Sequence, residues 1–235
     1  VNGVMTANPT LVKKARNLCE LNYMEAMELS HFGAKVLFPP TMIPAQKTHT
    51  PILIKNSLRP EDQGTWIRAK RTTRIENEIS GITSIPQLSI MTLEGGAGRG
   101  IHGLTARLFG CISDEDLDVY LMAQGSSELS ISFAIPTDHS ERLSHLIERE
   151  FSNEFENNNE FRLISEHEMC AVALVGEQIL YKTQIISKVF KILAFNDVGV
   201  EAIAHGSCER NLAFLIKEID ESKVLNALHD AFFTE

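Results

Sequence analysis

The sequence predicts an α+β fold, with two copies of one β-α-β-β-α-β unit in tandem, preceded by a partial α/β lobe. The first observation behind this prediction is an internal repeat. Residues 91–151 align onto 172–232 at a constant offset of 81, with 12 identities and no gap. The second is the order of hydrophobic patterns in each copy, which runs strand, helix, strand, strand, helix. Two copies of one structural unit explain both observations.

The front piece, residues 1–78, has its own local signals. Asn22 and Glu25 have the spacing of a capping box, which predicts a helix over 23–38 ended by Pro39 and Pro40. An apolar run over 51–56 predicts a short strand. A basic stretch follows, and we expect it to form a solvated linker: Arg68, Lys70, Arg71 and Arg74.

The first copy has the pattern of a ferredoxin-like unit. Strands are expected where apolar residues run or alternate, and helices where they recur every three or four residues. We expect strands over 87–93, 119–123, 129–135 and 161–165, and helices over 101–112 and 138–151.

The second copy is one strand short. The equivalent of 161–165 would fall near position 242, beyond Glu235. An unpaired edge would expose backbone groups, so we expect Ser80–Ile85 to supply the missing strand. The first unit would then be inserted in the second. The predicted domains are residues 1–78, 79–86 (the completing strand), 87–166 and 167–235.

Composition excludes several functions. Lys and Arg total 22 against 31 Asp and Glu, a net charge of −9, which argues against a nucleic-acid-binding surface. No apolar run reaches the roughly 18 residues of a membrane span, so no membrane partner is expected. No metal site is expected either, because Cys and His are not clustered. Free thiols and a reducing, cytoplasmic location are expected from four scattered cysteines: Cys19, Cys111, Cys170 and Cys208.

A glycine-rich segment, Glu94–Gly100, lies between a predicted strand and a predicted helix. Glycines leave backbone N–H groups accessible, and a helix N-terminus favours an anion, here the α-carboxylate of an amino acid. A simple flexible turn is the alternative. Gln124 is expected at the end of the neighbouring strand, where its amide can donate and accept hydrogen bonds.

Several motifs resemble those of the aspartate kinase family. Residues 2–9 are similar to its DGVxTADPR segment, and 24–37 to its EAxEL…FGAKVL helix. Residues 54–65 look like its IKNTxxPxxxGT strand and turn. The repeated part is similar to tandem ACT domains, and 123–128, AQGSSE, most resembles the threonine-sensitive type that is often fused to homoserine dehydrogenase.

The resemblance covers the C-terminal half of such a kinase, and the chain begins at Val1 in mid-element sequence, so we expect it to be cut from a longer parent. The parent would phosphorylate L-aspartate to 4-phospho-L-aspartate with ATP and Mg²⁺, in lysine, threonine and methionine biosynthesis. This segment lacks the family's phosphate loop and is expected to be inactive alone, with no cofactor of its own. The resemblance implies a nucleotide-side wall of Lys35, Asn2, Gly3, Asn8 and Pro9.

The ACT resemblance implies an amino-acid effector, threonine first and lysine second, and a homodimer formed through the ACT sheets. The expected effector contacts are Gly96, Ala97, Gly98, Arg99, Gly100, Ile101, Asp118, Met122, Gln124 and Ser126. The second copy has lost most of the loop glycines. Its equivalents, His205 and Ser207, are therefore expected to serve mainly as scaffold and interface.

A second hypothesis is a non-catalytic amino-acid-binding module from a kinase that has lost its activity. The departures from the family pattern favour it. Asn2 and Asn8 stand where the family has carboxylates, and Phe38 and Pro40 replace part of an HPRT motif. Carboxamides lack the charge that can position ATP, magnesium or an essential arginine.

Overall fold

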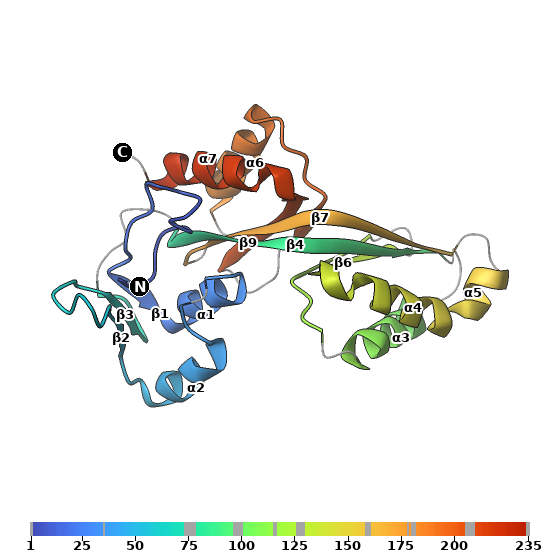
Figure 1. Cartoon of the computed structure of the whole chain (residues 1–235), viewed down its shortest axis with the longest axis horizontal. Helices are drawn as coiled ribbons and strands as arrows, with labels where there is room; N and C mark the ends of the chain where they lie inside the picture. The colour runs from blue at the N-terminus through green and yellow to red at the C-terminus, as the bar shows by residue number, and fades with distance from the viewer. Residues whose placement is uncertain are drawn as a thin grey trace.

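The computed structural model describes residues 2–34, 36–72, 79–95, 101–114, 117–125, 130–157, 161–177, 179, 182–204 and 210–233. Of residues 101, 102, 114 and 157 it describes only the backbone. The chain forms an N-terminal lobe and a two-unit sheet domain that lie against each other (Figure 1).

The lobe contains a small sheet and two helices. β1 (Glu20–Asn22) pairs in parallel with β3 (Thr65–Arg68), and β2 (Ile52–Ile54) pairs antiparallel with the other edge of β3. Helices α1 (Tyr23–His31) and α2 (Pro39–Thr48) pack beside each other.

The prediction of one helix over 23–38 is wrong beyond His31. The capping box at its start is confirmed, because the Asn22 side chain accepts a hydrogen bond from the Glu25 N–H at 2.9 Å. The helix ends because Gly33 adopts a left-handed φ of 105°. Pro39 begins α2 rather than stopping α1, since a proline at the first helical position loses no hydrogen bond.

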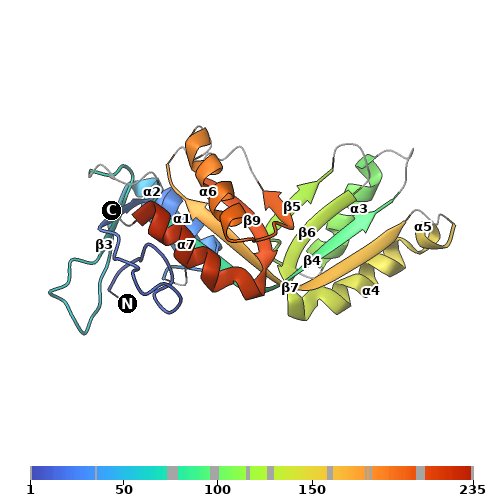
Figure 2. The ribbon, with the colours of Figure 1, turned by 90° about the horizontal axis from the view of Figure 1, so that it is seen from above.

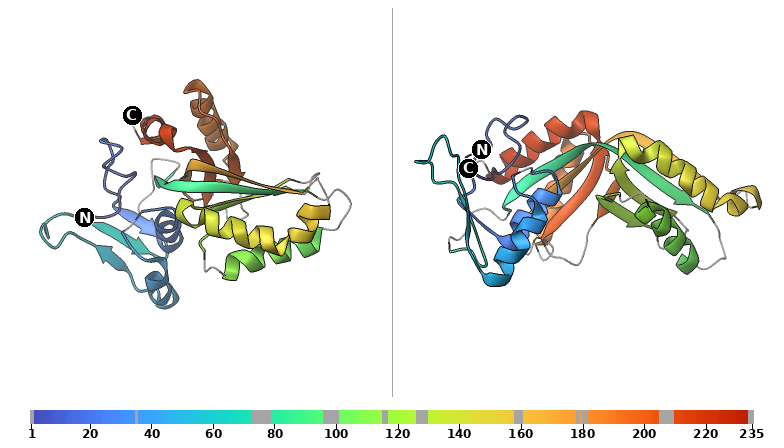
Figure 3. Two further views of the ribbon diagram at one scale, coloured as in Figure 1. Left: turned by 45° about the vertical axis from the view of Figure 1, so that its right-hand side comes forward. Right: turned by 60° about the horizontal axis from the view of Figure 1, so that its bottom comes forward.

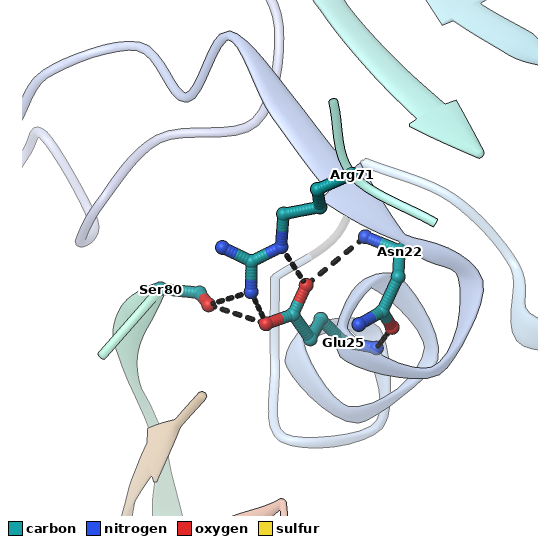
Figure 4. Close-up of polar contacts among 4 residues, drawn as sticks. All are labelled: Asn22, Glu25, Arg71 and Ser80. Atoms are coloured by element: carbon teal, nitrogen blue, oxygen red, sulfur yellow. Dashed lines mark hydrogen bonds and ion pairs between the residues drawn. The ribbon is translucent and has the colours of Figure 1, made fainter. Parts of the chain in front are cut away.

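The expectation of a solvated basic linker is wrong for Arg71. Its side chain is 9% exposed and forms an ion pair with Glu25, which is fully buried (Figure 4). Arg71 Nε donates to Glu25 Oε2 at 2.7 Å, and Ser80 Oγ donates to Oε1 at 2.7 Å. The backbone N–H of Asn22 donates to Oε2 at 3.0 Å. These contacts tie α1, the linker and the start of the large sheet together.

The large sheet has six antiparallel strands in the order β5-β6-β4-β7-β9-β8. The strands are β4 (Gly81–Glu94), β5 (Leu121–Gln124), β6 (Ser130–Pro136), β7 (Arg162–Val175), β8 (Ala202–Ala204) and β9 (Asn211–Lys217). The helices are α3 (Ile101–Asp114), α4 (Ser140–Glu150), α5 (Ser152–Asn157), α6 (Thr183–Phe195) and α7 (Glu221–Phe233), with 3₁₀ turns η1 (Thr137–His139) and η3 (Glu218–Asp220).

Two long strands belong to both units. The first part of β4, Ile82–Ile85, pairs with Ala171–Leu174 of β7, while 88–94 of β4 pairs with β6 in the first unit. This pairing completes the second unit and confirms the predicted fold class, including the insertion of the first unit in the second. The limits of the predicted domains stay predictions, and two of them fall inside β4 and β7.

The repeat offset appears in the fold as a local two-fold axis. Leu88 pairs with Met169, which is its own equivalent 81 residues later. All the remaining pairs between β4 and β7 also map onto each other, when the β4 residue is moved 81 positions forward and its β7 partner 81 positions back. Each strand has a bulge residue with left-handed φ, 60° at Gln87 and 59° at Glu168, and these two are also equivalents. The duplication therefore extends to backbone irregularities.

Helices cover one face of each half of the sheet (Figures 2 and 3). α3 and α4 pack on the first unit around Phe133, and α6 and α7 pack on the second around Phe214. The opposite face is lined largely by small residues, and the edge strands β5 and β8 approach each other there. Phe32, the residue after α1, fills this face.

The segment before β1 packs on α7 of the second unit. The Thr6 hydroxyl lies 2.9 Å from Nε2 of His229, and Asn226 donates to the Leu11 carbonyl at 3.0 Å. The His229 side chain is 1% exposed and stacks on Phe233. Nδ1 of His229 has no hydrogen-bond partner among the described residues.

We expect stability to fall as the pH drops below about 6.5, the ordinary pKa of histidine. Burial lowers the pKa of His229, and Arg16 and Lys14 lower it further, against the opposing charge of Asp230. At a pH between the lowered pKa of folded His229 and the ordinary pKa of this residue in the unfolded chain, the unfolded chain binds more protons than the folded chain. The free energy of unfolding therefore rises with pH in this window. Urea unfolding of wild type and His229→Gln at pH 7.5 and 5.5 measures this. The variant should lose less stability on acidification, and equal losses would contradict the prediction.

Candidate amino-acid-binding site

The edge strand β5 presents two of the predicted effector residues on the helix-covered face of the sheet. Met122 pairs with Phe133 and Gln124 with Ile131, so these side chains share the face on which α3 packs. Met122 is 43% exposed although it is a large apolar residue, and Gln124 is exposed. An exposed apolar side chain beside an amide, on an unpaired strand edge, suits a small ligand with polar and apolar parts.

The loop that leaves β4 begins beside the end of β5. Glu94 pairs with Ser130, and the Gly125 N–H donates to the Ser130 carbonyl at 3.1 Å. Gly95 has a φ of 143°, and a Cβ there would lie 2.7 Å from the Cα of Phe161. Only glycine fits this turn. The predicted contacts 96–100 and Ser126 lie outside the described residues, and Ile101 begins α3.

Asp118 lies at the opposite end of β5 from Gln124. It is exposed and stands two residues before Tyr120, whose N–H donates to the Ala134 carbonyl at 3.0 Å. Burial, and secondarily the charge of Asp118, raises the pKa of the Tyr120 hydroxyl. The structure thus brings Gln124 to the loop after β4 and leaves Asp118 beside Tyr120, a residue that the sequence did not single out.

The second copy repeats the exposed apolar residue of the edge strand. Ile203 of β8 pairs with Phe214 and is exposed, as its equivalent Met122 is. His205 and Ser207 lie outside the described residues. A cleft of 380 Å³ separates the start of α1 from Glu177 and Arg210, which flank the second copy's loop and its return strand. Glu177 and Arg210 therefore face the lobe across this cleft.

The residues of the expected nucleotide-side wall fall in two places. Asn2 accepts a hydrogen bond from Asn56 Nδ2 at 2.7 Å. Next to it, Gly3 has a φ of 135°, and a Cβ there would lie 2.3 Å from Asn17 Oδ1 and 2.5 Å from Thr65 Oγ1. The polar side chains next to Asn2 and Gly3 come from three separate segments: Asn17, Asn56 and Thr65. Asn56 and Thr65 lie in the motif over 54–65, whereas sequence reasoning missed Asn17.

Asn8 and Pro9 form an exposed turn several residues further on. Asn8 Oδ1 accepts hydrogen bonds from the N–H and hydroxyl of Thr10, at 3.0 and 2.8 Å. The Asn8 side chain thus caps its own turn. Lys35 lies outside the described residues.

The described residues contain no group of three or more His, Cys, Asp or Glu side chains placed to hold a metal ion. Within the same part of the chain, no helix is both long and apolar enough to cross a membrane. Cys19 is an exposed free thiol, Cys111 is partly buried and Cys170 is buried, and burial raises the pKa of Cys170. Cys208 lies outside the described residues.

Comparison with protein families gives two matches. The ACT domain model matches residues 91–151 and 172–232, the two copies of the repeat. The amino acid kinase family model matches residues 1–56, in the lobe.

Individual relatives agree with these matches. The chain is 33% identical over 233 residues to a bifunctional aspartokinase/homoserine dehydrogenase of Haemophilus influenzae, covering 99% of this chain and 28% of that protein. Aspartokinase III of E. coli with aspartate and ADP, in the R-state, superposes with a TM-score of 0.81 at 26% identity, over 99% of this chain and 51% of that one. The same enzyme with lysine and aspartate, in the T-state, gives 0.78 at 26% identity, over 99% and 50%.

Proposed function

The chain belongs to the ACT domain family and corresponds to the C-terminal half of aspartokinases, and from this premise we propose that it senses an amino acid for its parent kinase. The parent forms 4-phospho-L-aspartate from L-aspartate and ATP with Mg²⁺, and an end product of the pathway inhibits it. The observation that carries this proposal is the direct packing of the lobe on the duplicated sheet, through Phe32 and through the hydrogen bond from Ser80 to Glu25. A ligand bound to the sheet can therefore bias the lobe.

We propose threonine as the effector and lysine as the second choice. The first unit would bind it, because Gly95 starts a glycine-rich loop beside Gln124, and the second copy keeps Gly176 but has lost most of the other loop glycines. The aspartokinase III structure with bound lysine supports an amino-acid ligand. The proposed contacts are Gly96, Ala97, Gly98, Arg99, Gly100, Ile101, Met122, Gln124 and Ser126, with Asp118 at the far end of β5.

We propose that the parent is a homodimer that joins through its ACT sheets. β5 and β8 are the edges of the six-stranded sheet, and both carry an exposed apolar residue, Met122 and Ile203. Exposed apolar side chains of this kind favour association with a second copy. A cytoplasmic location stays a prediction that the free thiols favour.

The kinase assay tests the proposed function. Purified parent protein, incubated with ATP, Mg²⁺ and L-aspartate, should form an acyl phosphate that hydroxylamine traps, and threonine or lysine should inhibit it. This segment alone should give no product. A folded parent without turnover would instead support the non-catalytic amino-acid-binding module.

Threonine should also stabilise this segment on its own. At about 100 times its dissociation constant, a ligand that binds only the folded state adds about 2.7 kcal/mol to the free energy of unfolding. Thermal unfolding with L-threonine, L-lysine and D-threonine measures the effect, and the D enantiomer is the matched control. An equal response to both enantiomers of threonine would contradict a specific site.

A further inference from the structure

One aromatic contact joins the start of β5 to the end of α1. Tyr120 directly precedes β5, two residues from Asp118 and two from Met122. The centres of the Tyr120 and His31 rings are 6.0 Å apart, with the ring planes tilted by 47°. His31 is the last residue of α1, and its ring packs edge-on against Phe32 at 5.2 Å. The proposed effector strand thus contacts the lobe through a side chain.

The chain just after α1 is held tightly against β4. The Phe32 carbonyl accepts a hydrogen bond from the Thr83 hydroxyl at 2.6 Å. At Gly33, a Cβ would lie 2.5 Å from the carbonyl oxygen of Ser84. Thr83 and Ser84 belong to the part of β4 that completes the second unit, so these contacts hold the end of α1 to the second unit, while the Tyr120 ring reaches it from the first unit. Lys35, which the family resemblance assigns to the nucleotide side, follows two residues after Gly33.

The second copy provides an internal comparison. Glu201 is the equivalent of Tyr120, and its N–H donates to the Leu215 carbonyl at 2.9 Å, just as Tyr120 donates to Ala134. The backbone is therefore the same at both positions. The side chain differs, because Glu201 is exposed while Tyr120 is partly buried beside the lobe. The aromatic contact is a specific feature of the copy proposed to bind the effector.

We propose that the Tyr120–His31 contact transmits effector binding at β5 to the nucleotide side of the lobe, and that Tyr120 is a positioning residue rather than an effector ligand. This inference rests on the proposed function. A ligand that shifts the start of β5 also shifts the ring against which His31 packs. The His31 ring is exposed, but it also packs edge-on against the buried Phe32, so a shift of the Tyr120 ring is passed to the end of α1 through both aromatic contacts. Nucleotide and effector would favour different positions of this contact, which is what coupling between two sites requires.

The test separates effector binding from inhibition in the parent enzyme. Calorimetry gives the dissociation constant of threonine and, in parallel, of lysine, and the acyl phosphate assay gives the concentration for half inhibition. The Tyr120→Leu and His31→Leu variants should bind the effector with a dissociation constant within about twofold of the wild-type value. Half inhibition of these variants should need at least about fivefold more effector, because fivefold is the lower end of typical coupling between two sites. The double variant should be no worse than either single variant, because both changes remove one contact.

Two variants serve as controls. Tyr120→Phe keeps the ring, and Glu201→Leu makes the equivalent change in the second copy; both should be inhibited like wild type. If Tyr120→Leu fails to fold, His31→Leu removes the same contact from the lobe side.

Three results would overturn the inference. Parallel loss of binding and inhibition in Tyr120→Leu would make Tyr120 an effector ligand. Unchanged inhibition in both leucine variants would show that the contact transmits nothing. A wild-type parent that neither threonine nor lysine binds or inhibits would remove the proposed regulation itself, and this inference with it.

Discussion

Replacing Arg71 with alanine should lower the free energy of unfolding by about 3–5 kcal/mol, the usual cost of leaving one partner of a buried ion pair alone. Glu25 is fully buried, and among the described residues its carboxylate would keep the Ser80 hydroxyl and the Asn22 N–H as partners. Burial lowers the pKa of Arg71, with the charges of Glu177 and Glu20 opposing this effect, so the protein already bears a desolvation cost for the arginine. Urea unfolding monitored by circular dichroism measures the change.

Two further variants show whether the unpaired charge causes this loss. Glu25→Leu combined with Arg71→Met removes both charges and should recover most of the stability. Lys14→Ala breaks the exposed pair with Asp230, in which the side chains are 63% and 50% exposed, and should cost less than about 1 kcal/mol. An Arg71→Ala variant as stable as Lys14→Ala would contradict the assignment.

Replacing Phe32 with alanine should cost about 3–5 kcal/mol, as for other buried aromatic residues. Phe32 is 5% exposed and packs against the small-residue face of the sheet, near Leu88 and Met169. Few neighbours there can fill the space, because alanines line much of that face. The variant should also loosen the lobe from the sheet, which faster amide hydrogen exchange in α1 would report.

Phe195 provides the matched control for this substitution. It has the same side chain but is 91% exposed at the end of α6, so Phe195→Ala should change stability by less than about 0.5 kcal/mol. Similar losses in the two variants would show that the Phe32 contact does not hold the lobe.

The repeat made much of the fold predictable. A constant offset of 81 requires equal units, and the missing strand of the second unit pointed to Ser80–Ile85. What the offset did not reveal was that β4 and β7 are each continuous through both units. Pro86 and Gln87 are exposed between the two buried halves of β4, and this break in the apolar pattern is typical of the end of one strand and the start of another.

The errors lie in the lobe, where elements are short. β1 and β3 have three and four residues, too few for a period to emerge. Arg71 was predicted to be solvated because its neighbours in sequence are basic, whereas its partner Glu25 lies 46 residues away. Long-range pairing of this kind leaves no local signal.

The candidate site was predictable only in part. The order of the strands, which the sequence predicted, places Gln124 beside the loop after β4. The positions of Asp118 and Tyr120 depend on where the lobe packs. Since His31 comes from another domain, the pattern of the first unit carries no information about this contact.

Calorimetric titration of threonine into wild type, Gln124→Ala and His205→Ala tests the central claim most directly, that the first unit is the sensor. Wild type and His205→Ala should each bind one threonine per chain, and Gln124→Ala should lose most of the affinity. Binding that survives Gln124→Ala and disappears in His205→Ala would place the sensor in the second unit and contradict the account.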